Sequence, residues 1–146
     1  MAGETIVALG TTKILESNGS AISANTVVRA TGANYDQLVD GGGFALADFT
    51  LSFTFAIAPT ENLVLAVYAR PLDIDGTNDA EVPEPTRPTF FIGSIPVNDV
   101  TTVQYGFLMG RQVPPKADYY VHNLAGQSVS AGWTLKVTPR SYKAAP

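Results

Sequence analysis

The segment 73–79 comes closest, in residue types and spacing, to a metal-binding loop. It reads Asp-Ile-Asp-Gly-Thr-Asn-Asp, with one glycine among several oxygen-bearing side chains. Closely spaced carboxylate and amide oxygens suit Ca²⁺, but the twelve-residue spacing of an EF-hand loop is absent. Asp and Asn side chains in turns also bond their own backbone. The segment therefore indicates either a weak cation loop or a self-bonded turn. The possible ligands are Asp73, Asp75, Asn78 and Asp79.

Residues for nucleophilic or zinc chemistry are scarce. His122 is the single histidine, and the chain has no cysteine. A zinc site usually needs several His or Cys ligands, and a catalytic histidine needs a nucleophile and an orienting carboxylate. The glycines at 41–43 lack the Lys-Ser/Thr of a phosphate-binding loop. We therefore expect no enzymatic activity, no metal and no cofactor. Alternation along the strand places His122 beside Tyr120, at a surface or an interface.

Aromatic side chains offer a second kind of chemistry, the stacking of sugar rings. Exposed aromatic residues on a β-domain, together with the acidic loop, would make a carbohydrate-binding module, which we keep as an alternative. Trp133 lies in an alternating strand, where core packing is the ordinary role of a large ring. The candidates for such a platform are Tyr105, Tyr119, Tyr120 and Trp133.

Charge and composition limit the classes of partner that the chain can bind. The 146-residue chain has a net charge of −4 and an isoelectric point near 4.7. A nucleic-acid-binding protein needs a basic patch, so we expect no nucleic-acid partner. The start of the chain lacks a signal-peptide pattern, and apolar runs are far shorter than the ~20 residues of a membrane helix, so we expect no membrane partner. The absence of cysteine suits synthesis in a reducing cytoplasm.

Period-two alternation sets the fold class. In the segment 49–57 a large apolar residue occupies every second position, which lines one face of a strand and no face of a helix. Similar short segments recur between Gly and Pro breaks, so we expect seven or eight strands in an all-β, antiparallel sandwich or barrel. One helical turn is expected at 35–39, and the proline-rich segment 70–89 is expected to be a long loop. The other predicted strands are 25–30, 63–70, 89–95, 101–109, 119–124 and 133–138.

The first 24 residues differ from the rest, being small, polar and rich in Gly, Ser and Ala. Either they form a flexible terminus, or they form an extended N-terminal arm (1–24) beside a β-sandwich domain (25–146). Scattered apolar side chains favour an arm that lies on a neighbouring subunit. The candidate contact residues of this arm are Ile6, Val7, Leu9, Ile14 and Leu15.

Two stretches carry a family resemblance. An aliphatic strand at 64–73 leads into Asp-Gly-Thr-Asn at 75–78, and Gly-Trp-Thr-Leu-Lys at 132–136 begins a last strand that runs into Pro-Arg-Ser-Tyr at 139–142. Over roughly residues 45–142 the chain resembles a group of small tailed-bacteriophage virion proteins encoded among head genes.

The resemblance implies a jelly-roll-like β-sandwich that decorates and stabilises the outside of a capsid. Its partner would be the major capsid protein, and its location the virion exterior after synthesis in the host cytoplasm. Capsid lattices have local two-fold and three-fold axes, so a dimer or a trimer is expected. A tail or neck component with the same fold is an alternative.

Overall fold

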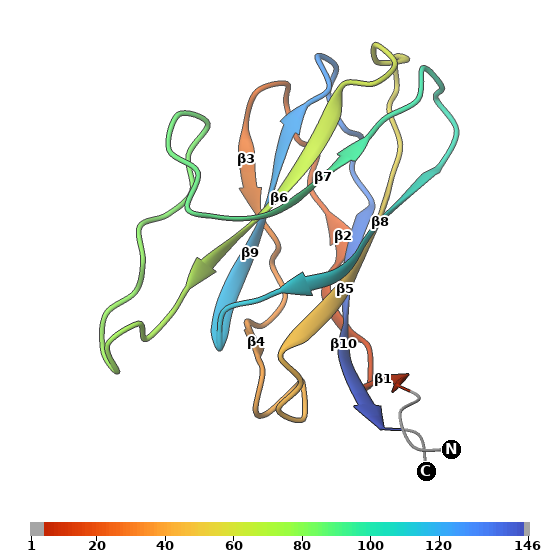
Figure 1. The fold of residues 1–146 in the computed structure, drawn as a ribbon. Helices are drawn as coiled ribbons and strands as arrows, with labels where there is room; N and C mark the ends of the chain where they lie inside the picture. The colour runs from red at the N-terminus through yellow and green to blue at the C-terminus, as the bar shows by residue number, and fades with distance from the viewer. Residues whose placement is uncertain (1–4, 145–146) are drawn as a thin grey trace.

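The structure is a computed structural model that describes residues 5–144, and all of its regular elements are strands (Figure 1). Within the described range no helix has the length and apolarity to cross a membrane. The strands are β1 (Thr5–Leu9), β2 (Lys13–Gly19), β3 (Val27–Arg29), β4 (Tyr35–Asp36), β5 (Leu46–Phe53), β6 (Val64–Pro71), β7 (Phe90–Pro96), β8 (Gln104–Gln112), β9 (Lys116–Leu124) and β10 (Trp133–Ala144).

The strands form two antiparallel sheets with jelly-roll order. One sheet has the order β1-β10-β5-β8, with β2 also paired to β10, and the other has the order β3-β9-β6-β7, with β4 also paired to β9. The chain passes repeatedly from one sheet to the other, so that β2-β10-β5-β8 faces β3/β4-β9-β6-β7. This arrangement of eight strand positions in two sheets is that of a jelly roll. The predicted all-β, jelly-roll-like sandwich is confirmed.

The core lies between the sheets and follows the alternation of the sequence. On β5 the side chains of Phe49, Leu51 and Phe53 are 0–3% exposed. The ring of Phe49 meets that of Tyr119 from the opposite sheet, with ring centroids 5.1 Å apart. Aromatic packing of this kind contributes beyond its buried area. The regular strand ends at Phe53, four residues earlier than predicted; Phe55 still forms an isolated bridge with Val129 and is buried, whereas Ile57 is exposed.

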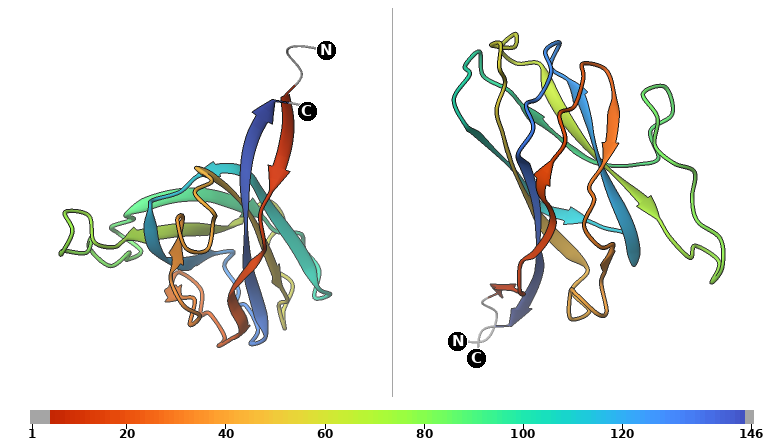
Figure 2. Two further views of the ribbon diagram at one scale, coloured as in Figure 1. Left: turned by 90° about the horizontal axis from the view of Figure 1, so that it is seen from below. Right: turned by 180° about the vertical axis from the view of Figure 1, so that it is seen from behind.

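The N-terminal segment supplies a strand to the sandwich. β2 pairs with β10, and Leu15 and Ile22 are buried in the core. β1 pairs with the last residues of β10, and beyond Arg140 the only strand partner of β10 in the described chain is β1. These two strands leave the body together as a ribbon (Figure 2). Of the predicted arm 1–24, the strand β2 therefore forms an edge of the sheet. Residues 1–4 of the arm lie outside the described residues.

One further segment departs from the predictions, and one long loop agrees with them. The segment 35–39 begins with the short strand β4 and continues as a turn, because Asp36 accepts hydrogen bonds from the N–H groups of Leu38 and Val39. The loop between β6 and β7 begins after Pro71 and extends well away from the sandwich (Figure 1). That loop was predicted from its prolines and acidic residues.

Candidate functional site

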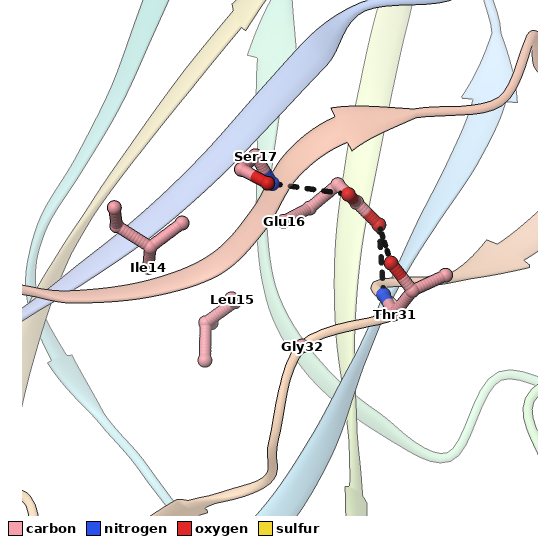
Figure 3. Close-up of a pocket in the computed structure, with 6 residues that line it drawn as sticks. All are labelled: Ile14, Leu15, Glu16, Ser17, Thr31 and Gly32. Atoms are coloured by element: carbon pink, nitrogen blue, oxygen red, sulfur yellow. Dashed lines mark hydrogen bonds between the residues drawn. The ribbon is translucent and has the colours of Figure 1, made fainter.

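A pocket of about 240 Å³ lies between β2 and the segment that follows β3 (Figure 3). Glu16, which is 3% exposed, forms part of its wall. Its Oε1 accepts hydrogen bonds from the N–H groups of Ser17 and Asn18 at 3.0 Å, and its Oε2 accepts from the N–H and the hydroxyl of Thr31 at 2.8 and 2.6 Å. Burial raises the pKa of Glu16, but these hydrogen bonds outweigh it and leave the pKa lowered. The carboxylate therefore acts as a structural clamp.

His122 is buried, with 3% of its surface exposed, which corrects its predicted surface or interface position. Its Nδ1 lies 3.4 Å from the hydroxyl of Tyr68, and its Nε2 lies 3.4 Å from Oδ1 of Asn25. Tyr68 and Tyr120 flank it on the outer face of the sheet, so that large rings cover it. Burial lowers the pKa of His122. A tyrosine and an amide as hydrogen-bond partners do not make the nucleophile–base–carboxylate arrangement of a triad.

The acidic loop bonds to its own chain. Oδ1 of Asp75 accepts hydrogen bonds from the N–H groups of Thr77 and Asn78 at 3.0 and 2.7 Å, which is an Asx turn. Asp73 pairs with Lys116 at 2.8 Å, and Asp79 accepts a hydrogen bond from the N–H of Asp73. Over residues 5–144 no three His, Asp or Glu side chains are grouped so that they could hold a metal ion.

The aromatic residues considered for sugar stacking do not share a surface. Trp133, Tyr119 and Tyr120 are 1%, 2% and 6% exposed, whereas Tyr105 is 66% exposed. The indole N–H of Trp133 donates to the carbonyl of Ser20 at 2.7 Å, so this ring is anchored inside the sandwich. The alternative of a stacking platform made by these four residues is therefore not supported, and the core packing favoured for Trp133 is confirmed.

Three of the predicted arm contacts lie together on the β1–β10 ribbon. Ile6, Val7 and Leu9 are 37%, 47% and 59% exposed. Val7 is directly opposite the exposed Tyr142 on β10, so the two share one face of the ribbon. A two-stranded ribbon with apolar side chains open to water is marginal by itself.

The other two predicted contacts lie on β2, and they differ. Ile14 is 53% exposed on the outer face of its sheet, opposite Lys136. Leu15 is 2% exposed and belongs to the core, which corrects its assignment as a contact residue. Successive strand residues point to opposite faces, which separates Ile14 from Leu15, and the register shift beside them leaves Leu15 and Glu16 both buried.

A further apolar surface lies on β8 and was not predicted. Tyr105, Phe107 and Met109 alternate with the buried Gln104 and Leu108 and are 66%, 64% and 63% exposed. The alternation itself was legible in the sequence, because large apolar residues occupy every second position from 103 to 109. The intervening positions 104, 106 and 108 hold Gln, Gly and Leu, so the alternation alone favours the face of Tyr105, Phe107 and Met109 as the inner one, whereas the structure places that face outside.

No family model and no curated protein matches the sequence. Among solved structures, a chain of Desmodium yellow mottle tymovirus is similar at 11% sequence identity, with a TM-score of 0.34 over 100% of this chain and 91% of that chain. The jelly-roll assignment made above rests on strand order and pairing within this chain.

Proposed function

We propose that this protein is a structural virion protein that decorates and stabilises the outer surface of a bacteriophage capsid through the major capsid protein. The observation that carries the proposal is the projecting β1–β10 ribbon, with Ile6, Val7, Leu9 and Tyr142 exposed on it. An element of this kind gains stability when a neighbouring protein covers it.

The body behind the ribbon suits a role in assembly. A filled core between two antiparallel sheets makes a stiff unit that can carry load from one contact to another. Two of its ionisable side chains, Glu16 and His122, are buried and lie within hydrogen-bonding distance of partners in the same chain. Sandwich folds host many functions, so the proposal depends on the ribbon and not on the fold.

Removing residues 1–11 tests the proposal, because this deletion takes away β1 and leaves β2 in the sheet. Removal of all of 1–24 would also take Leu15 and Ile22 out of the core. We expect the truncated protein to keep its β circular dichroism and to lose saturable binding to undecorated mature heads. Leu9→Asp is expected to weaken binding in the same direction.

Ile57→Asp is the matched control, because Ile57 is 65% exposed and follows the end of β5 that lies away from the ribbon. It should bind heads as the unmodified protein does. Full occupancy by the 1–11 deletion would contradict the proposal. Mass spectrometry of tailless heads separates a head protein from a tail or neck component, because a tail component would be missing from them.

A further inference from the structure

The strand β8 forms an unprotected edge of its sheet. Within the described chain it pairs with β5 and with no strand on its other side. Such an edge presents a row of unpaired N–H and C=O groups, which soluble proteins usually protect with charges, prolines or a covering segment. The segment 103–109, Val-Gln-Tyr-Gly-Phe-Leu-Met, contains neither a charged residue nor a proline.

The outer-face side chains of the same strand are apolar and exposed. Tyr105, Phe107 and Met109 stand on the outer face, and Val103 just before the strand is 53% exposed. An apolar stripe therefore runs directly alongside the unpaired backbone edge. The two features together fit an added β-strand, because main-chain bonds would satisfy the edge while the side chains are covered from one side.

We propose that β8 is a self-association edge: two copies of this chain pair β8 with β8 in antiparallel fashion about a two-fold axis at Gly106. The β2-β10-β5-β8 sheet of one copy then continues into that of the second copy. The inference does not depend on the proposal that the ribbon binds a capsid.

The register of this β8–β8 pairing follows from the alternation of side chains between the two faces of the strand. Residues directly opposite each other across an antiparallel pair point to the same face, so an outer-face residue must meet an outer-face residue. The regular pairing of β8 with β5 runs without interruption from Gln104 to Leu108, and Gly106 is its midpoint. With the axis there, Tyr105 faces Phe107 of the second copy, and Val103 faces Met109 of the second copy. Every exposed apolar side chain of the stripe then meets another.

Charge and area favour a second copy as the occupant. Copies of a chain with net charge −4 repel each other in general, so they associate best through an uncharged surface, which this edge provides. Because the second copy covers these side chains from one side only, Tyr105 and Phe107 would together bury roughly 100–150 Å² per copy. Met109, Val103 and the backbone add to this, giving an interface smaller than the usual size range, as in weak and transient contacts. We therefore expect reversible association that strengthens where copies are held close together.

Sedimentation velocity of the full chain, up to about 1 mM, tests the proposal because weak association registers there. We expect a concentration-dependent monomer–dimer equilibrium, and Phe107→Glu should remove it without changing the β circular dichroism. Ile14→Glu is the matched control, because Ile14 is 53% exposed on the outer face of the same sheet but on β2. It should dimerise as the unmodified chain does. If the unmodified chain is a monomer at all concentrations, the proposal is overturned. This holds even if Phe107→Glu weakens binding to heads, because the strand would then contact the capsid and not a second copy.

Cysteine cross-linking tests the register in a chain that has no cysteine of its own. Tyr105→Cys and Phe107→Cys proteins, mixed and mildly oxidised, should form a disulfide-linked heterodimer, because opposed Cβ atoms lie about 5 Å apart. Each variant alone should cross-link far less, since its own copies sit on the diagonal, about 7–8 Å apart. Equal cross-linking in all three samples, or none in the mixture, overturns the proposed register.

Discussion

Asp48 on β5 and Arg140 on β10 are joined by two hydrogen bonds. Nε and Nη2 of Arg140 donate to Oδ2 of Asp48 at 3.0 and 2.8 Å, and Oδ1 of Asp48 accepts from the backbone N–H of Gly110 at 2.7 Å. Gly110 has a φ of +60° and sits where two residues of β8 oppose one of β5, which is a β-bulge. One carboxylate thus connects the base of the ribbon with the end of the self-association edge.

The variant Asp48→Asn should loosen the ribbon. The amide keeps the shape of the carboxylate, but its NH₂ group must face either the guanidinium or the N–H of Gly110, and both are donors. We expect Tm to fall by several degrees and amide-exchange protection to drop in residues 5–9 and 141–144.

Ser52→Ala is the control for this change. Its hydroxyl lies 2.7 Å from that of Thr134, across the same two strands, but the bond is uncharged. This variant should have a smaller effect on Tm and leave the protection of the ribbon unchanged. Unaltered amide-exchange protection of the ribbon in Asp48→Asn would contradict the conclusion that Asp48 stabilises the ribbon.

Asn123 should be among the most costly polar residues to replace. It is 0% exposed, its amide nitrogen donates to the carbonyls of Ile22 and Gln127 at 2.9 and 2.8 Å, and its Oδ1 accepts from the N–H of Ala125 at 3.0 Å. Asn123→Ala leaves three backbone groups without these partners, so we expect the free energy of unfolding to fall by about 3 kcal/mol. Denaturant titration measures this.

Asn98→Ala serves as the control, because the hydrogen bonds of Asn98 to Gln104 use its backbone N–H and carbonyl. Its stability should stay within about 0.5 kcal/mol of the unmodified protein, as for most surface changes. If Asn123→Ala lowers the free energy of unfolding by no more than Asn98→Ala does, Asn123 does not hold the segments around Ile22 and Gln127 together.

The alternating strands were predictable from the sequence, and their arrangement was not. The apolar period of two located β5, β6, β8, β9 and β10 to within a few residues at most ends. The strand β2 was missed because a register shift beside Leu15 breaks the alternation, and because Glu16 is buried in a clamp made by Thr31, fifteen residues later. Long-range partners of this kind leave no local period.

For the candidate surfaces, too, the sequence indicated the apolar residues but not their arrangement. The apolar residues of β1 were predicted to make contacts, but their placement on a ribbon depends on pairing with the far end of the chain. His122 was placed on a strand face correctly, yet its burial depends on Tyr68, which lies on another strand. On β8 the more apolar face, with Tyr105, Phe107 and Met109, lies outside, so the alternation alone indicates the wrong inner face.

Acidification should destabilise the protein through His122. Burial lowers the pKa of this imidazole in the folded state, so below the unfolded value of about 6.5 the unfolded chain binds a proton that the folded chain does not. The free energy of unfolding should fall as pH drops below about 6.5, by at most about 1.4 kcal/mol per pH unit from this group. His122→Gln should flatten the profile there, and an unchanged slope in that variant would contradict the assignment.

Glu16 should control stability in a lower pH range. Its folded pKa lies below the ordinary value of 4.5, so its contribution is present above about pH 4.5 and is lost as the pH falls through the folded pKa. Glu16→Gln turns one acceptor oxygen into an NH₂ group that faces existing donors, so we expect a loss of about 2 kcal/mol at pH 7.

The comparison across pH separates the clamp from simple packing. The stabilities of Glu16→Gln and the unmodified chain should draw closer as the pH falls below about 4.5, because protonation of Glu16 disrupts the same hydrogen bonds that the substitution disrupts. Glu61→Gln, at an exposed turn before β6, should lie close to the unmodified protein throughout. A constant difference between Glu16→Gln and the unmodified protein from pH 7 to pH 3 would show that the shape of the side chain, rather than its charge, holds the segment after β3 against β2.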